Sequence, residues 1–356
     1  MASTRRDILR GTASLALLPL AAQPAAAEGQ LESTLLIRTT GGVFEAALKR
    51  NFFDSFSKAT GVRVIPFASG YGEMMAKTAA MEAAGNVEWD IISPQYDELT
   101  QISQFLTDLG DCSSMPNVAK DGVPGACGRY GVLYLTGGQL LTWNTTIVKG
   151  KKPRNWADFF DLKAFPGRRA LPNTGSPWAT LMLALLADGV PRDKLFPLDL
   201  DRAFAKLDTI KPNVATWWKT GDQSNRMWQQ DEIAMALMWG GQAYSAKRRG
   251  IPIDYTYNQA IADFGAWAIL KGAPHPNAAR AFINFYMASP ESHARFAHDM
   301  GYTTSNKEAG ALLEPADRDD LLSTQEKLND VIRTDYVWLA AHRSEVITRF
   351  QDWLSS

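Results

Sequence analysis

The chain has 356 residues, 46% of them hydrophobic, and it carries 37 basic against 38 acidic side chains. This length predicts roughly two domains. The near-zero charge balance argues against a nucleic-acid-binding surface or a polybasic membrane patch. After the N-terminal region, no apolar run reaches the roughly 18 to 20 residues that a membrane-spanning helix needs.

Residues 1–27 predict an export signal. Arg5, Arg6 and Arg10 precede a short apolar stretch, and residues 25–27 (Ala-Ala-Ala) supply an A-x-A cleavage pattern. The sequence "TRRDIL", residues 4–9, matches the twin-arginine export signature. An ordinary secretory signal with a chance arginine pair is the alternative. Either signal predicts a periplasmic protein.

The two cysteines, Cys112 and Cys127, lie in a segment rich in Pro, Gly and Asn. An oxidising compartment permits a disulfide between them. The bond would close a loop of about 15 residues and contribute on the order of 3 kcal/mol. A redox-active pair is disfavoured because there is no C-x-x-C motif, and the four histidines show no metal-ligand spacing with the cysteines. We therefore expect a structural disulfide, no metal and no cofactor.

Strands and helices alternate at the start of the chain. Apolar runs predict strands at 35–37, 62–67 and 89–94, and a 3.6-residue periodicity predicts helices at 43–60 and 71–84. This β-α-β-α-β order implies a parallel sheet. The next apolar run, 130–144, contains Gly137-Gly138, which suits a bend or a close backbone approach.

A second α/β set begins near Asn155, which is expected to cap a short helix. Ser176 is expected to be the N-cap of the helix that follows the next strand, with Pro177 at its first position. The remaining predicted elements are strands at 233–241 and 264–272 and helices at 200–210, 277–288, 289–301 and over 323–354.

Two α/β lobes without a linker imply that the chain crosses between them more than once, which allows hinge closure. We expect lobe 1 to hold residues 28–138 and about 265–310. Lobe 2 is expected to hold about 139–264 and the C-terminal helices, 311–356.

Six segments carry a resemblance to a known family: "FSKATGVRVI", "WDIISPQYDEL", "NWADFFDLKAFPGRRAL", "MALMWGGQAYSAKRRGIPIDY", "AARAFINFYMASPE" and "MGYTTSN". In this order the chain resembles the periplasmic solute-binding proteins of ABC importers, in the branch of the spermidine/putrescine receptors. The resemblance covers about residues 35 to 310. It implies an α/β fold of the two-lobed periplasmic binding protein type (type II), each lobe being a mostly parallel sheet flanked by helices. It also implies a monomer that captures a solute between the lobes, delivers it to an inner-membrane ABC permease, and catalyses no reaction.

The resemblance also implies where a ligand would be held. Tyr96 and Trp239 fall at aromatic ligand positions, and Phe264 replaces a second cleft tryptophan. The family's acidic positions fall on Ala266, Ser176 and Ala179, with Trp178 beside them. Three missing carboxylates would leave the ammonium groups of a long polyamine desolvated and unpaired, which is costly.

The remaining polar residues fit a small zwitterion, such as an amino acid of the γ-aminobutyrate type, or a small amine. Thr39, Thr40 and Gly41 precede a helix N-terminus, where N–H groups and the dipole favour a carboxylate. Arg226 offers a fork for the same group, and Asp263 could hold an ammonium. Capping or strand-end hydroxyls and a structural salt bridge are the alternative roles of the threonines and Arg226.

Four tryptophans lie between residues 216 and 244. We expect Trp239, with Trp178, to line the cleft, and Trp217 and Trp218 to belong to packed regions, whereas Trp228 fits either role. The rival hypotheses are an exported enzyme and a receptor of the same fold for a phosphonate, thiamine or iron(III). An enzyme is disfavoured because no G-x-S-x-G, H-E-x-x-H, P-loop or G-x-G-x-x-G after a strand occurs.

Overall fold

The computed structural model describes residues 31–356 except 231–232, 322–326 and 328–329. Residues 31–356 form one compact unit. The predicted export signal, residues 1–27, lies outside the described residues. Within the part of the chain that is described, no helix has the length and apolar character to cross a membrane.

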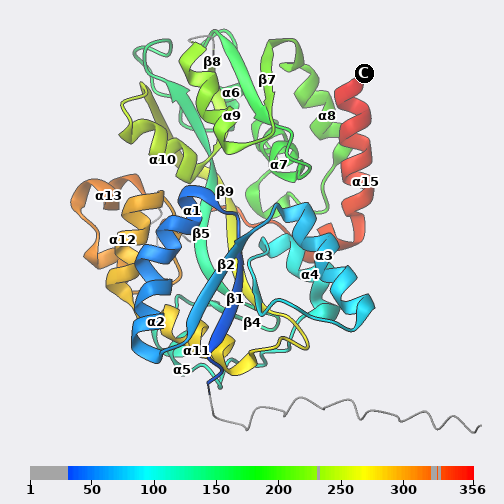
Figure 1. The fold of residues 1–356 in the computed structure, drawn as a ribbon. Helices are drawn as coiled ribbons and strands as arrows, with labels where there is room; N and C mark the ends of the chain where they lie inside the picture. The colour runs from blue at the N-terminus through cyan, green and yellow to red at the C-terminus, as the bar shows by residue number, and fades with distance from the viewer. Residues whose placement is uncertain (1–30, 231–232, 322–326, 328–329) are drawn as a thin grey trace, which may run out of the picture. The chain divides into compact units, whose positions relative to one another are not determined.

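The unit contains a ten-stranded mixed sheet with the main order β2-β1-β3-β9-β5-β8-β6-β7 (Figure 1). The strands are β1 (Thr34–Thr39), β2 (Arg63–Ala68), β3 (Ile91–Ile92), β4 (Cys127–Gly128), β5 (Gly131–Asn144), β6 (Arg168–Pro172), β7 (Val214–Trp218), β8 (Ile233–Trp239), β9 (Ile253–Ile269) and β10 (Thr303–Thr304). Parallel pairing joins β1 to β2 and β3, and joins β6 to β7 and β8. The two long strands β5 and β9 pair antiparallel with each other and connect these parallel groups.

Helices flank the sheet on both sides of the long strands. They are α1 (Gly42–Leu48), α2 (Asp54–Thr60), α3 (Tyr71–Ala84), α4 (Tyr96–Ile102), α5 (Pro116–Asp121), α6 (Trp156–Phe160), α7 (Trp178–Ala187), α8 (Leu200–Asp208), α9 (Gly221–Arg226), α10 (Gly240–Arg248), α11 (Pro276–Met287), α12 (Pro290–Met300), α13 (Pro315–Asp320) and α15 (Tyr336–Ser355).

The predicted β-α-β-α-β opening is confirmed, including the parallel pairing of its three strands. The predicted helix at 43–60 is one helical stretch in which a π-helical turn, Lys49–Phe53, joins α1 to α2. The sequence did not predict β7, whose five residues include the exposed Ala215. The strand predicted to begin at Phe264 is the end of β9, which begins at Ile253 in the structure. Polar residues in the first part of β9, such as Asp254 and Asn258, break the apolar pattern on which strand prediction depends, and β7 has only five residues.

The prediction of Ser176 as a helix cap is wrong. Helix α7 begins at Trp178, and Pro177, the residue before it, makes no capping hydrogen bond. The Asn155 cap is confirmed, because its side chain accepts a hydrogen bond from the Asp158 N–H. The Ser176 side chain is therefore available for another purpose.

Two large hydrophobic cores occupy the unit. The first core is rich in aromatic rings from α1, α2, α11 and α12 and includes Phe52, Phe282 and Tyr286. The second core is built around α7, of which nine residues are buried, together with α8 and α15. Strands β5 and β9 contribute to both cores. The lobe boundaries given above stay a prediction.

A third segment also runs between the cores. The backbone N–H of Ala262 donates to the Ile332 carbonyl at 2.8 Å, and the Ile332 N–H donates to the Ala260 carbonyl at 2.7 Å. Val331 belongs to the first core and Ile332 to the second. The chain therefore crosses between the cores at β5, at β9 and at residues 331–332.

The β5–β9 ladder is irregular in the region of these crossings. Register shifts lie between Leu133 and Leu135 and between Gln139 and Leu141. Gln259 has a left-handed backbone (φ 60°), which the Trp156 N–H and indole N–H support by donating to its side-chain and backbone oxygens. Bulges bend strands and redirect side chains. Asp263 and Phe264 lie between the two irregularities.

Candidate functional site

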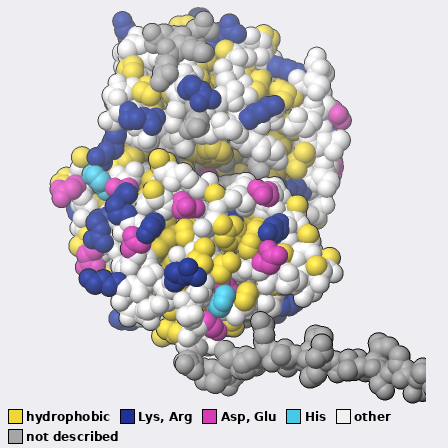
Figure 2. Space-filling model, viewed as in Figure 1, with side chains coloured by type: hydrophobic (Ala, Val, Ile, Leu, Met, Phe, Trp, Pro, Cys, Tyr) yellow, Lys and Arg dark blue, Asp and Glu magenta, His cyan; other side chains and the backbone are white. Residues whose placement is uncertain are grey.

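Three cavities of about 220, 30 and 330 Å³ share Gln95 and Trp239 in their walls. We call these three cavities together the cleft. Their walls come from segments that pack on both cores, and Figure 2 shows a recess with hydrophobic side chains on its floor. Concave, partly apolar sites with a few polar groups are the usual form of small-molecule sites.

Elements of the first core place polar groups on one wall of the cleft. Thr40 follows β1, and Gln95 and Glu98 belong to the start of α4. Gln95 and Glu98 form a capping box, in which the Gln95 N–H donates to the Glu98 carboxylate at 2.9 Å. The Gln95 side-chain amide also lies 3.5 Å from the Asp263 carboxylate. This contact joins α4 to β9 inside the cleft.

Elements of the second core supply the opposite wall. Trp239 ends β8 and lines all three cavities, and Ser176 and Trp178 stand at the start of α7. Lys219 follows β7, and Arg343 reaches in from α15. The Arg343 guanidinium lies 4.5 Å from the centroid of the Trp178 ring, a cation–π contact that holds the cation at the cleft.

A glycine pair that follows Trp239 allows other groups to pack closely beside it. Gly240-Gly241 opens α10 directly after Trp239, and a β-carbon on Gly241 would lie 2.6 Å from the Tyr302 ring. Tyr302 lines the same cavity as Trp239, so glycine is required for this close packing. The Gly137 position faces the same ring at 3.2 Å, in agreement with the close approach expected from the glycine pair in β5.

The other tryptophans of the 216–244 segment have structural environments. Trp218 and Trp228 are fully buried, and Trp217 packs on Phe350 and Trp353 of α15. The structure thus separates Trp239 from its three neighbours in the segment.

Several predicted site residues are not brought to the cleft cavities. The Thr39 side chain is buried and its hydroxyl donates to Glu45, a carboxylate in the first turn of α1. Gly41 lines none of the cavities described here, but its φ of 74° and a β-carbon position 2.7 Å from Ala68 require glycine. Arg226 is exposed at the end of α9 and is absent from the same cavity walls.

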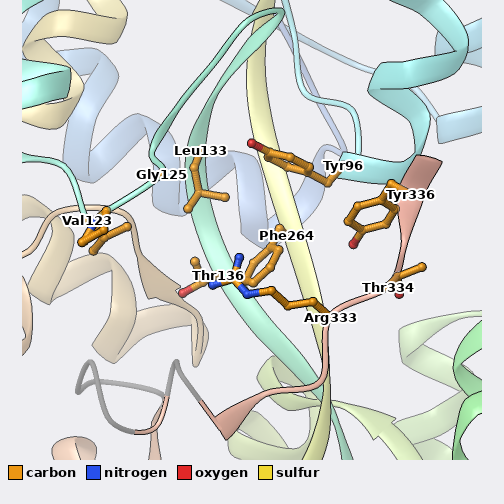
Figure 3. Close-up of a pocket in the computed structure, with 10 residues that line it drawn as sticks. Tyr96, Val123, Gly125, Leu133, Thr136, Phe264, Arg333, Thr334 and Tyr336 are labelled. Carbon is orange, nitrogen blue, oxygen red and sulfur yellow. The ribbon is translucent and has the colours of Figure 1, made fainter. Parts of the chain in front are cut away.

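Tyr96 lines a neighbouring cavity that has Phe264 and Tyr336 in common with the cleft (Figure 3). Burial raises the pKa of the Tyr96 hydroxyl, and the Arg333 charge partly opposes this increase. Tyr96 therefore stays a neutral hydrogen-bond donor at physiological pH.

Two of the positions where the family resemblance implied carboxylates are core positions here. Ala266 and Ala179 are fully buried, in different hydrophobic clusters. Only the third position, Ser176, reaches the cleft.

Among the described residues, the negative and positive side chains in the cleft walls are equal in number. Asp263 lines two of the cavities, and Glu98, Lys219 and Arg343 line the third. Sequence reasoning found Asp263 and missed the others, since no short motif surrounds Lys219 or Arg343. The cleft is therefore equipped for a solute that carries both charges.

The disulfide Cys112–Cys127 is confirmed, with Cα atoms 6.1 Å apart. Across the described residues, no group of three or more His, Cys, Asp or Glu side chains could hold a metal ion.

The sequence and the structure both resemble known proteins. The family described as "Bacterial extracellular solute-binding protein" matches residues 51–323. A γ-aminobutyric acid-binding protein of Pseudomonas aeruginosa is 30% identical over 92% of this chain and 93% of its own length. A spermidine/putrescine-binding periplasmic protein of Escherichia coli K12 is 24% identical over 74% of this chain and 76% of its own length.

Among solved structures, one titled as a GABA receptor superposes with a TM-score of 0.79 at 30% identity, covering 90% of this chain and 97% of that one. These matches confirm the predicted two-lobed α/β fold class and the resemblance on which it rested.

Proposed function

The chain belongs to the bacterial extracellular solute-binding proteins, and from this premise we propose that it captures a small zwitterion of the γ-aminobutyrate type in the cleft. It then presents the solute to the permease of an ABC importer. The observation that carries this proposal is the charge balance of the cleft walls: Asp263 and Glu98 against Lys219 and Arg343.

The ammonium end of the solute binds beside Asp263. This carboxylate lines two cavities together with Trp239 and Phe264. Aromatic faces attract ammonium groups and contact methylenes, and a carboxylate fixes the position of the charge. Gln95, 3.5 Å from Asp263, orients the carboxylate towards this end.

The carboxylate end binds beside Arg343 and Lys219. Both cations line one cavity of the cleft, together with Trp239 and Ser176. Trp239 and Ser176 also line a cavity that contains Asp263. The stacking of Arg343 on Trp178 limits its rotamers, so less entropy is lost when it binds a carboxylate.

A polyamine fits this charge pattern poorly, although one relative is named for spermidine and putrescine. A dication would bring two ammonium groups next to Lys219 and Arg343. Glu98 lines the same cavity as these two cations, so its negative charge is already offset there and does not compensate a second ammonium group. Like charges in a partly desolvated cleft raise the free energy of the bound state.

Calorimetry on the purified protein tests the proposal. γ-Aminobutyrate should bind, whereas butyrate, butylamine and putrescine, each lacking one of the two opposite charges, should bind at least about tenfold more weakly. Arg343→Gln should reduce γ-aminobutyrate affinity, and Arg226→Gln, at an exposed site outside the cleft walls, is the matched control. Tighter binding of putrescine than of γ-aminobutyrate would refute the zwitterion assignment.

Binding closes the protein around β5, β9 and residues 331–332, the three segments that join the cores. A ligand stabilises the closed form by the difference between its affinities for the closed and open forms. We also propose that the solute leaves chemically unchanged, so proton NMR of γ-aminobutyrate incubated with the protein should show no product.

The named relative from Escherichia coli is periplasmic, and we propose that this chain reaches the periplasm as a monomer through the twin-arginine route. An Arg5→Lys, Arg6→Lys double variant should stay in the cytoplasmic fraction, because the export receptor reads the arginine pair. Normal export of this variant would favour the ordinary secretory route.

A further inference from the structure

Three helices meet beside the cleft, at the junction of α10, α12 and α13 (Figure 1). Helix α10 contributes Ala243 to a hydrophobic cluster with β8, whereas α12 contributes Phe296 to the first core. Leu313 and Leu321, which flank α13, form a separate apolar cluster with Tyr244 of α10 and with residues of α12. The α13 segment therefore lies against two helices that pack on different parts of the protein.

The Asp317 carboxylate of α13 joins these two helices. One of its oxygens accepts hydrogen bonds from the Tyr244 hydroxyl at 2.6 Å and from the Arg248 guanidinium at 3.0 Å, both on α10. The other oxygen lies 2.5 Å from Nδ1 of His298 on α12. Asp317 is only 5% exposed, and burial alone would raise its pKa, but the hydrogen bonds with Tyr244 and His298 hold the pKa below its usual range. The carboxylate is therefore charged, and each oxygen binds a different helix.

The two helices touch closely next to this carboxylate. A β-carbon on Gly301, the residue after α12, would lie 2.6 Å from the Tyr244 ring. A β-carbon on Gly241, near the start of α10, would lie 2.9 Å from the Met300 carbonyl oxygen. Neither position has room for a side chain, so α10 and the end of α12 are held at one short separation.

Both helices lead directly into the cleft. Trp239 immediately precedes α10, Tyr302 follows the end of α12 by two residues, and both line the cavity of about 220 Å³. The α10 partners of the carboxylate, Tyr244 and Arg248, are the fifth and ninth residues of this nine-residue helix. Because so short a helix moves as a rigid unit, a displacement of α10 from α12 also moves Trp239 away from Tyr302.

We propose that Asp317 is a positioning residue for solute binding: by holding α10 to α12, it fixes Trp239 relative to Tyr302 in the cleft wall. Asp317 lines none of the cavities described above, so it acts without touching the solute. This inference rests on the proposed function, because it concerns the same cleft. A wall that is fixed in advance loses less conformational freedom when the solute binds, which raises the affinity.

Fluorine NMR of the unliganded protein, labelled with 5-fluorotryptophan, tests the positioning directly. The Trp239 resonance is assigned from the signal that Trp239→Phe removes. In Asp317→Ala this resonance should shift or broaden, because α10 is released from α12. Asp317→Asn keeps an oxygen acceptor for the Tyr244 hydroxyl but loses the charge, so its resonance should lie between those of Asp317→Ala and the wild type. Calorimetry should show γ-aminobutyrate affinity reduced about tenfold in Asp317→Ala and less in Asp317→Asn.

Asp188→Ala is the matched control. The Asp188 carboxylate, at the end of α7, also binds two cations, Arg202 and Lys206, but both lie on α8 within the second core. This variant should leave the Trp239 resonance and the γ-aminobutyrate affinity unchanged.

The proposal fails if both folded Asp317 variants keep the wild-type Trp239 resonance, or if Asp188→Ala shifts it as much as Asp317→Ala does. Wild-type γ-aminobutyrate affinity in both Asp317 variants would also refute it. The fluorine spectra are recorded without solute. A shifted Trp239 resonance in a protein whose wild type binds no γ-aminobutyrate would therefore support the role of Asp317 and refute only the proposed ligand.

Discussion

Trp218 and Trp239 are in contact, with ring centroids 4.9 Å apart, yet they differ in their surroundings. Trp218 is fully buried and its indole N–H donates to the Leu237 carbonyl at 3.1 Å. Trp239 is partly exposed and lines all three cleft cavities, and no acceptor of the described chain receives a hydrogen bond from its indole. One indole N–H is hydrogen-bonded inside the protein, whereas the other indole lines the cleft.

Arginine shows the same division. Arg169 is fully buried and donates to the carbonyl groups of Phe159, Phe165 and Gly167. Arg343 is only partly buried and points into the cleft from α15. Residue type therefore says little about role. For the two tryptophans, what separates interior from cleft is whether the indole N–H finds an acceptor within the described chain.

The largest effect is expected for Trp218→Ala. Removing this fully buried indole should lower the free energy of unfolding by about 3–5 kcal/mol, because large-to-small core substitutions leave a cavity. Urea unfolding of Trp218→Ala and Trp239→Ala measures the contrast directly. Equal losses of stability in the two variants would abolish the distinction between the two indoles.

Replacing both cysteines by serine should destabilise the protein by about 3 kcal/mol, because the Cys112–Cys127 bond closes a loop of 15 residues in the unfolded chain. Zwitterion affinity should not change, because neither cysteine lines the cleft. Thermal unfolding and calorimetry on the same samples separate the two quantities. A loss of γ-aminobutyrate affinity in the folded variant would show that the disulfide loop also shapes the cleft.

The sequence predicted those features that depend on local pattern or on a single short motif. Apolar periodicity predicted the β1–β3 unit, and a cysteine pair in a chain with an export signal predicted the disulfide. Trp239, which lies in a segment that resembles the family, and Asp263, which was predicted from its charge, both lie in the cleft walls.

The missed features depend on contacts between distant segments. Arg343 is one of two arginines on the C-terminal helix α15, and nothing in the local sequence distinguishes it from Arg349; only packing against α7 brings it to Trp178. The position of Thr39 before a helix predicts a ligand contact, but the Thr39 hydroxyl instead donates a hydrogen bond to Glu45, six residues later. Tertiary partners of this kind leave no periodic signal.

Trp239→Ala tests the proposed role of the partly exposed indole, the one that lines the cleft. Its γ-aminobutyrate affinity should fall about 30-fold, close to 2 kcal/mol, because in the proposed complex the ring contacts both the methylenes and the charge of the solute. Trp239→Phe should retain part of the affinity because an aromatic face remains. Calorimetry showing wild-type affinity in folded Trp239→Ala would remove this residue from the site.

The smallest expected effect concerns a buried histidine whose contribution to the free energy of unfolding depends on pH. His293 is fully buried, its Nε2 lies 2.8 Å from the Tyr286 carbonyl, and its Nδ1 has no partner in the described chain. Burial lowers the pKa of His293 to about 3, and the hydrogen bond to Tyr286 only partly opposes this decrease. The imidazole is therefore neutral in the folded protein at every pH above that value, whereas in the unfolded chain it gains a proton near pH 6.5.

Because the unfolded chain binds more protons between these two pKa values, His293 makes the free energy of unfolding fall as pH decreases from about 6.5 towards 3. The slope is about 1.4 kcal/mol per pH unit, so the loss between pH 7.5 and 5.5 is about 1.4 kcal/mol. His293→Gln should be less stable at pH 7.5 but should lack this part of the slope. Phe52→Leu, which removes a ring 5.0 Å from His293 and keeps the imidazole, should be destabilised with the wild-type slope. Parallel urea titrations at the two pH values compare the three proteins, and an unchanged slope in His293→Gln would show that this histidine is protonated in the folded state.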